Sequence, residues 1–451
     1  MQTTSTAVPG PRPWPLIGNL PGVRSAGLLQ YFEQQWHRYG DAFRVKLGPM
    51  KAVVLAHPEA IKHVLATKKE NYIKAETYDG VRRVIGNGIL ALEGEAWKAR
   101  RALVQPAFHR NGLAKLAGAM VRSGSQYFDE LARRAGTGWF TADAHREMVT
   151  LTLDVVVRAL FGETLGPVAN VSYEALGDAM ELITTSANGI VLPEWVPTPG
   201  NRKFHHTMNE VEGAIYRVIE AGRASTGDEG TLLSMLLSSR DADTGQPLSD
   251  RDVRDEVFTM FVAGHETTAL TLTWFFTLLE GHDDVLAKMR AEVDEVLQGR
   301  DPTFEDVPKL TSVRQVVDET LRLKGPVAMN ARTAVDDDVV MGFELSKGDV
   351  VMPFFWGAHR HRDFWSDPER FDPTRFTPEQ NKARHPWAYI PFSAGQRMCI
   401  GNTFSLVESV LLLAMLLRRF DVEVPPGQHV EPVVMATVRP SKAVQVRFRV
   451  R

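Results

Sequence analysis

The chain of 451 residues contains a single cysteine, Cys399, whose surroundings favour a thiolate metal ligand. It lies in segment 392–401, Phe-Ser-Ala-Gly-Gln-Arg-Met-Cys-Ile-Gly, which leads into a predicted helix. The N–H groups and the dipole at a helix start stabilise a negative sulfur. Gly395 and Gly401 allow a tight bend and a close approach of the backbone to a flat ring, and Arg397 can neutralise a carboxylate at the ring edge. Such a ligand pushes electron density onto iron and favours O–O cleavage.

A second segment with unusual residue types is Ala263-Gly-His-Glu-Thr-Thr268, in the middle of a predicted long helix. One glycine and two threonines are poor mid-helix choices, since each weakens the helix or competes for its hydrogen bonds. A tolerated kink is the structural alternative to a functional site here.

Two pairs of residues share a helix face by their spacing. Glu319 and Arg322 are three apart, and Trp97 and Arg101 are four apart. Taken alone, the first pair is equally consistent with a surface ion pair of small energetic value. The second, taken alone, favours an amphipathic surface helix.

Segment 392–401 resembles the heme-binding signature of the cytochrome P450 superfamily, Phe-x-x-Gly-x-Arg-x-Cys-x-Gly. All five defining positions are present, namely Phe392, Gly395, Arg397, Cys399 and Gly401. Three further motifs occur in the family's order and spacing, so the resemblance covers nearly the whole chain. It implies a mainly α fold in which heme b lies between a long central helix and a Cys-bearing loop plus helix. Cys399 would be the axial ligand of the iron.

The resemblance also implies roles for the segment from Ala263. The small side chain of Ala263 leaves room for dioxygen and substrate, and the helix opens slightly at Gly264. Thr267 supplies a hydroxyl where dioxygen is activated, and Glu266 is the acid that links this hydroxyl to solvent protons. His265 is interpreted as an incidental polar neighbour.

In the family, the motif Trp97-Lys-Ala-Arg-Arg101 contacts a heme propionate. Arg332 resembles another propionate arginine, Arg397 would be a further contact, and His359 is a weaker candidate. Several cations facing two propionates make a consistent site.

The resemblance gives Glu319 and Arg322 a structural role together with Arg375. These three residues would lock the segment after residue 364 against the core beneath the heme. Two departures from the family occur. Gly325-Pro326 stands where Pro-Pro is common, and Ser405 stands where alanine is usual.

The substrate pocket is predicted to be apolar, which indicates a lipophilic substrate such as a terpenoid, fatty acid, steroid or polyketide. A helical segment at 183–191 is a further candidate for the entrance. The predicted lining residues are Val84, Ile85, Ile89, Leu90, Met260, Val262, Ala263, Val327, Ala328, Met435 and Ala436.

Three functions compete at this stage. A monooxygenase needs dioxygen, electrons and a proton relay, which Glu266 and Thr267 would supply. A peroxide-using or isomerising heme-thiolate enzyme, and a heme-binding sensor, would need no such relay. We therefore expect a monooxygenase that inserts one oxygen atom by hydroxylation or epoxidation. Without a flavin or ferredoxin segment, its electrons would come from a separate ferredoxin and ferredoxin reductase. Lys98 and Arg100 are predicted to reach solvent and dock that partner.

Composition limits the other possibilities. Hydrophobic residues make up 44% of the chain, charged residues 24%, and the formal net charge is −3. Because phosphate binding needs a basic surface, nucleic acid is not expected as a partner. One cysteine excludes an intrachain disulfide and a zinc site of several thiolates. Neither a signal peptide nor the ~20-residue apolar stretch of a membrane anchor is apparent, so we expect a cytoplasmic monomer.

The elements that must position these residues follow from hydrophobic periodicity and turn signals. No linker interrupts the chain, so we expect one domain over 1–451, with 1–25 as an extended, Pro-rich lead-in. Ser249 and Asp252 are predicted to cap the long helix, which ends near Leu279. The other expected elements are a hairpin in 41–56, helices at 58–65, 95–104, 147–160, 210–221, 313–323 and 402–420, strands in 339–353, a meander without periodicity at 364–389, and strands after 420.

Overall fold

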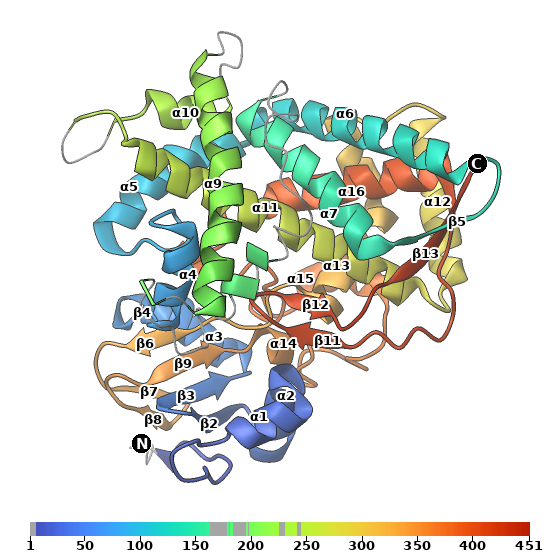
Figure 1. The fold of residues 1–451 in the computed structure, drawn as a ribbon. Coiled ribbons are helices and arrows are strands. Elements are labelled where there is room, and N and C mark those ends of the chain that lie inside the picture. Colours follow the sequence, from blue (N-terminus) through green and yellow to red (C-terminus); the bar gives the residue numbers. More distant parts are fainter. Residues whose placement is uncertain are drawn as a thin grey trace. The chain divides into compact units, whose positions relative to one another are not determined.

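The computed structural model of the chain is rich in helices, which include 58% of its residues, and has only small sheets (Figure 1). This agrees with the expectation of a mainly α fold. The structure describes residues 6–162, 178–179, 181–183, 195–196, 198–224, 231–240 and 245–451.

The chain forms two compact units, each assembled from segments that are distant in sequence. The first consists of Met1–Tyr78, Asp318–Cys399 and Glu431–Ser441. The second consists of Asp79–Val317, Ile400–Val430 and Lys442–Arg451.

The first unit is built on a five-stranded mixed sheet with the order β2-β3-β9-β6-β4. Its strands span Ala42–Leu47, Met50–Leu55, Val350–Pro353, Arg332–Ala334 and Tyr72–Lys74, in that order. β2 and β3 are the predicted hairpin, and Gly48 takes a φ of +61° in its turn, a conformation that favours glycine. β3 pairs in parallel with β9, which brings together residues such as Ala52 and Val350 that are far apart in the sequence. The hairpin and the strands expected in 339–353 are therefore confirmed.

Short helices and two smaller sheets complete the first unit. The lead-in is not extended throughout, because Leu20–Ala26 form helix α1. The meander is also more regular than expected, since a short 3-10 helix (Pro373–Phe376) and α15 (Pro378–Ala383) interrupt it. The remaining elements are β1 (Thr6–Ala7), β7 (Asp338–Val340), β8 (Phe343–Leu345), β11 (Pro432–Val434), β12 (Val438–Pro440), α2 (Leu28–Tyr39), α3 (Pro58–Lys62), a π-helix (His63–Thr67), 3-10 helices at Lys69–Asn71 and Gly395–Arg397, and α14 (Phe355–Ala358).

The second unit is dominated by helices, among which α6, α7, α11 and α16 pack side by side (Figure 1). They span Arg110–Ala135, Ala144–Val156, Asp250–Leu279 and Asn402–Arg419. The other helices are α4 (Thr77–Ile85), α5 (Gly94–Val104), α9 (Pro199–Ala224), α10 (Leu232–Ser238), α12 (Asp283–Leu297), π-helix Val157–Phe161, and 3-10 helices Gln105–Phe108 and Phe304–Lys309. A three-stranded sheet has the order β10-β13-β5, with bounds Phe420–Glu423, Gln445–Val450 and Phe140–Asp143. Among the described helices, none combines the length and apolar character needed to cross a membrane.

Helix α11 begins as predicted. The Ser249 side chain accepts a hydrogen bond of 3.1 Å from the backbone N–H of Asp252, so the N-cap is confirmed. The helix expected at 313–323 is α13, Thr311–Lys324, which passes from the second unit into the first.

Candidate functional site

Cys399 lies at the end of a tightly closed loop in the first unit. Its backbone N–H donates to the carbonyl of Phe392 at 3.0 Å, which closes the loop across the signature segment. The thiol is exposed to solvent, and α16 begins three residues later without an acidic residue in its first turn. An exposed thiol beside a helix start suits a thiolate, because the helix N–H groups favour negative charge.

The two glycines of the loop differ in what they require. Gly395 has a φ of +70°, and a Cβ there would lie 2.1 Å from the carbonyl oxygen of Leu65, so only glycine fits. Gly401 has a φ of −87°, which any residue can adopt. The predicted tight bend is therefore confirmed at Gly395, while the close approach of Gly401 to a flat ring stays a prediction.

In the second unit, α11 is buried along its length except at one place. From Val253 to Phe276, every side chain is buried apart from those at Ala263, Gly264 and Thr267. This small uncovered strip lies in the segment that the resemblance assigns to dioxygen and substrate. A flat, thiolate-ligated ring needs an accessible thiol, which Cys399 provides, and an uncovered stretch of helix, which α11 provides. The described residues therefore fit heme.

Gly264 has a packing role that the sequence interpretation missed. A Cβ at this position would lie 3.0 Å from Cγ2 of Val156 on α7, so the small residue allows the close approach of two helices. Helix α11 extends continuously through this point, and the expected slight opening at Gly264 stays a prediction. The Thr267 hydroxyl donates to the carbonyl of Ala263 at 2.8 Å, which satisfies its proton within the helix.

The two residues between Gly264 and Thr267 are both buried. His265 is 1% exposed, and its Nδ1 lies 2.6 Å from the carbonyl of Phe261, so this nitrogen carries the proton. That contact agrees with its interpretation as a neighbour rather than a ligand. Glu266 is 2% exposed, so it does not itself reach solvent.

One acid in this region was missed by the sequence analysis. Glu408 on α16 is fully buried, and neither carboxyl oxygen has a hydrogen-bond donor among the described residues. Its neighbour Thr268 instead contacts the hydroxyl of Ser405 at 3.0 Å. Burial raises the pKa of Glu408 well above its usual value, and the Thr268 hydroxyl only partly opposes this shift. Burial therefore favours the uncharged form of the Glu408 carboxyl. A lone acid within the apolar run 406–417 was the signal that could have found it.

The Glu408→Gln protein will gain stability relative to wild type as the pH rises from 5 to 8. A raised pKa means that the folded state holds a proton that the unfolded state releases, so this stabilisation is complete below about pH 4.5 and lost as pH rises. The loss is about 1.4 kcal/mol per pH unit until the folded carboxyl ionises. Urea unfolding of both proteins across that pH range measures it. Glu305→Gln, at an exposed position, is the control. If the free energy of unfolding changed with pH in the same way in wild type and in Glu408→Gln, Glu408 would be ionised in the folded protein.

The predicted propionate residues belong to both units. In the second unit, Trp97 is buried and Arg101 is half-buried on α5. In the first, Arg332 is buried on β6 and Arg397 is half-buried beside the Cys399 loop. Their part in binding propionates stays a prediction.

His359 does not fit as a propionate cation. Its Nε2 accepts a hydrogen bond of 3.0 Å from the backbone N–H of Ile390. Burial lowers the pKa of His359 to about 3, helped by the nearby charges of Arg360 and Arg322, so the ring is neutral. It is a structural residue that fixes the start of the signature loop.

Arg100 is also not where the sequence placed it. Its side chain is buried and binds Glu256 at 3.1 Å, so it cannot form part of a docking surface. Lys98 does reach solvent, with 60% of its side chain exposed, and pairs with Glu95 at 2.7 Å. Both Lys98 and Arg100 were predicted to reach solvent, but only Lys98 does.

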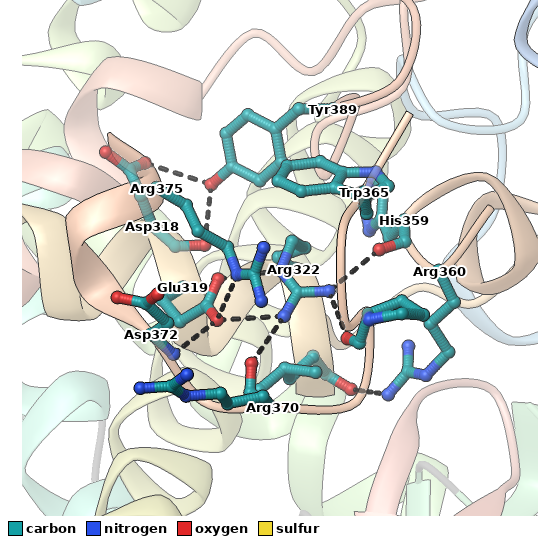
Figure 2. A network of polar contacts seen from close by, with 12 residues as sticks. Asp318, Glu319, Arg322, His359, Arg360, Trp365, Arg370, Asp372, Arg375 and Tyr389 are labelled. Carbon is teal, nitrogen blue, oxygen red and sulfur yellow. Dashed lines mark hydrogen bonds and ion pairs between the residues drawn. The ribbon is translucent and has the colours of Figure 1, made fainter. Parts of the chain in front are cut away.

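Glu319, Arg322 and Arg375 form the predicted buried network in the first unit (Figure 2). Arg322 donates from Nε and Nη2 to the two carboxyl oxygens of Glu319, at 2.6 and 2.8 Å. Its Nη groups also donate to the backbone carbonyls of His359, Pro368 and Arg370. All five N–H donors are thus used. Arg375 lies 3.6 Å from Glu319, and both members of the main pair are fully buried. The surface-pair alternative is therefore wrong.

The predicted pocket residues differ in accessibility. Val84, Ile85, Ile89, Met260, Val262 and Ala328 are buried, Met435 is half-buried, and Leu90, Ala263, Val327 and Ala436 are exposed. Whether they contact a substrate stays a prediction. Of the proposed entrance segment 183–191, residues 184–191 lie outside the described residues.

A second group of possible metal ligands, Asp41, His57 and His361, has its ligand atoms within 4.8 Å of one another. Nδ1 of His57 accepts from the backbone N–H of Glu59 at 3.1 Å, and Nδ1 of His361 accepts from Asp363 at 3.3 Å. With Nδ1 of His361 accepting, its Nε2 donates to Asp41 at 3.0 Å. Asp41 and His361 are therefore joined by a hydrogen bond, and the ring of His57 packs edge-on against that of His361.

Comparison with known proteins identifies the fold and the chemistry. The sequence model of the family described as cytochrome P450 matches residues 8–448. Cyclooctat-9-en-7-ol 5-monooxygenase of Streptomyces melanosporofaciens is 33% identical over 94% of this chain and 93% of its own length. Pentalenene oxygenase of Streptomyces avermitilis is 31% identical over 100% and 99%. The crystal structure of the cytochrome P450DA heme domain superposes with a TM-score of 0.88, at 28% identity and over 99% and 98% of the two chains. The protein is therefore a member of the cytochrome P450 family, a heme-thiolate monooxygenase that uses dioxygen to oxidise lipophilic small molecules.

Proposed function

We propose that this monooxygenase hydroxylates or epoxidises a polycyclic terpenoid. The observation that carries the proposal is that two relatives matching nearly the whole chain are named for cyclooctat-9-en-7-ol and for pentalenene. The apolar character of the predicted lining residues supports it, because a hydrocarbon skeleton offers few polar groups to recognise. A terpenoid is thus favoured over the fatty acid, steroid and polyketide alternatives.

Heme with a thiolate ligand supplies the reductive activation of dioxygen and the cleavage of its O–O bond. Cys399 would provide the thiolate, since it is the only cysteine of the chain. Trp97, Arg101, Arg332 and Arg397 would hold the propionates. Guanidinium groups suit this task because they bind carboxylates through paired N–H donors.

Thr267 would control protons beside the reacting oxygen. Its own hydroxyl proton is engaged by the carbonyl of Ala263, so its lone pairs are left to accept a hydrogen bond at the uncovered strip of α11. Glu266 is the acid that would renew the proton. Because its side chain is buried, each proton from solvent must pass through intervening groups before it reaches Glu266.

The electrons would come from a separate ferredoxin and ferredoxin reductase. Exposed charges of the enzyme would steer the acidic ferredoxin and affect the association rate more than the affinity. With Arg100 buried, Lys98 is the residue of the predicted pair that is left for this role.

A spectral binding screen tests the substrate class. Pentalenene and cyclooctat-9-en-7-ol would be titrated into the ferric holoenzyme beside lauric acid and testosterone, and bound ligands would be tested for turnover with ferredoxin, its reductase and NADPH. We expect the terpenoids to shift the heme spectrum at the lowest concentrations and to yield oxygenated products. Tight binding and oxidation of only the fatty acid or the steroid would contradict the proposal.

Thr267→Ala will keep heme and substrate binding but divert electrons to hydrogen peroxide. Removing one oriented donor or proton relay typically costs ~100-fold or more in a chemical step. Product formed per NADPH consumed should therefore fall steeply, while NADPH consumption continues. Product and hydrogen peroxide measured in the same reaction provide the comparison.

Thr273→Ala is the matched control for this variant. The Thr273 hydroxyl donates to the carbonyl four residues earlier, at 2.7 Å, as the Thr267 hydroxyl does, but Thr273 is buried. Its replacement should leave coupling unchanged. If Thr267→Ala coupled as well as wild type, Thr267 would have no part in proton control.

A further inference from the structure

The loop that precedes α5 is held against α11 by two neighbouring carboxylates. The backbone N–H of Asn87 donates to Oδ2 of Asp255 at 2.7 Å. The backbone N–H of Ile89, two residues on, donates to Oε2 of Glu256 at 3.0 Å. Alternate amides of the loop 86–90 thus bind successive side chains of one helix turn.

The loop backbone lies directly on this turn of α11. A Cβ at Gly86 would be 2.1 Å from Oδ1 of Asp255, and Gly86 has a φ of +72°. A Cβ at Gly88 would be 2.0 Å from Oγ1 of Thr259. No side chain fits at either glycine, so the loop backbone itself packs against Asp255 and Thr259. The loop also carries Ile89 and Leu90, two of the predicted pocket residues.

The charges around Glu256 do not balance among the described residues. Arg100 of α5 binds Glu256 at 3.1 Å and Asp252 at 3.4 Å. Arg254 binds Asp255 at 2.8 Å and also pairs with Glu212 of α9. Of these four carboxylates, Asp252 and Glu212 are partly exposed, whereas Asp255 and Glu256 are buried next to each other, which favours protonation of one buried carboxyl.

Glu256 is the carboxyl best placed to take that proton. It is fully buried, and its Oε1 has no hydrogen-bond partner among the described residues. Burial raises the pKa of Glu256 to about 7, although Arg100 and the Ile89 amide oppose the shift and Asp255 adds to it. A proton on Oε1 would leave Oε2 available to Ile89. The ionised form would hold the same amide through a stronger, charge-assisted hydrogen bond.

We propose that Asp255 and Glu256 are positioning residues that fix the loop 86–90 and thereby determine which substrates the pocket accepts. This inference rests on the proposed function, which makes the loop a wall of the pocket. When Glu256 is ionised, the loop is held tightly and discrimination between ligands of different size is strong. When Glu256 is protonated, the loop is held less tightly and discrimination is weaker.

The first experiment measures amide hydrogen exchange in the loop of the holoenzyme and needs no substrate. Glu256→Ala removes the acceptor for Ile89, so the amide should exchange about tenfold faster, as expected for the loss of a charge-assisted hydrogen bond. Glu256→Gln keeps an acceptor oxygen and should lie between. Asp250→Asn removes an exposed, ion-paired carboxylate at the start of the same helix and should change nothing. Unchanged exchange at Ile89 in Glu256→Ala would overturn the proposal.

The second experiment measures ligand discrimination, taken as the ratio of dissociation constants for the two ligands of different size that wild type binds most tightly. In wild type, this ratio should be at least about threefold larger at pH 8 than at pH 6, since ionisation strengthens the hold on the loop. Glu256→Gln should give the low-pH ratio at both values. A ratio with the same pH dependence in wild type and Glu256→Gln would overturn the role in specificity. The ratio can be measured with any two ligands that bind, whether or not they are terpenoids. Failure of both terpenoids to bind would therefore count against the proposed function and not against this role of Glu256.

Discussion

Cys399→Ser will abolish the long-wavelength Soret band of the reduced, carbon-monoxide-bound protein, and monooxygenase activity with it. The serine oxygen is smaller than the sulfur and does not donate electron density as a thiolate does, so the push that favours O–O cleavage is lost. The loop itself should survive, because the bond from residue 399 to Phe392 that closes it uses backbone atoms only. The carbon-monoxide difference spectrum and the rate of product formation measure the two effects.

Met398→Leu is the control for this variant. Met398 is adjacent, 39% exposed, and carries the only other sulfur of the signature segment. A thioether can ligate heme iron, so the two sulfur atoms must be distinguished. The Met398→Leu protein should keep the thiolate band and its activity. Survival of the band in Cys399→Ser would show that another residue ligates the iron.

The features predicted correctly from sequence are those whose signal lies within a few neighbouring residues. The N-cap at Ser249 depends on its spacing to Asp252, and the hairpin depends on alternation around a turn at Gly48. The partnership of Glu319 with Arg322 was visible as helical spacing. Only the family resemblance could supply Arg375, which is more than fifty residues away.

The features that sequence missed depend on burial, which tertiary packing decides. Arg100 and Lys98 are both charged residues on α5, yet one is buried against Glu256 and the other is exposed. His359 became neutral because its surroundings exclude water and already contain two guanidinium groups. Glu408 was missed because the burial and the partners of an acid in an apolar helix cannot be inferred until the helix that packs against it is known. Spacing predicts which residues share a face, whereas only the fold shows what covers that face.

Arg322→Ala will yield little heme-loaded protein and will lower the free energy of unfolding by about 3–5 kcal/mol. The substitution leaves the buried carboxylate of Glu319 with Arg375 at 3.6 Å and the Asp372 amide at 2.8 Å. It also removes the donors to three backbone carbonyls that hold the segment leading to the Cys399 loop. Heme content per mole of protein and the urea midpoint of the purified fraction are the measurements.

Arg370→Ala controls for the loss of an arginine from the same network. The backbone carbonyl of Arg370 accepts from Arg322, but its side chain is exposed, so the substitution keeps the hydrogen bond. Its effect should stay within about 0.5 kcal/mol. Wild-type heme content and stability in Arg322→Ala would mean that the buried network does not support the fold.

The double variant Glu319→Gln with Arg322→Ala separates the two costs of losing Arg322. A buried charge without its partner is more costly than a neutral amide at the same place, because desolvation penalises the ion most. If the stranded carboxylate dominates, the double variant will be more stable than Arg322→Ala alone. If the unpaired carbonyls of His359, Pro368 and Arg370 dominate, the second substitution will recover nothing. We expect partial recovery, since the carboxylate is fully buried while the carbonyls of Pro368 and Arg370 lie in a segment with exposed residues that can adjust toward solvent.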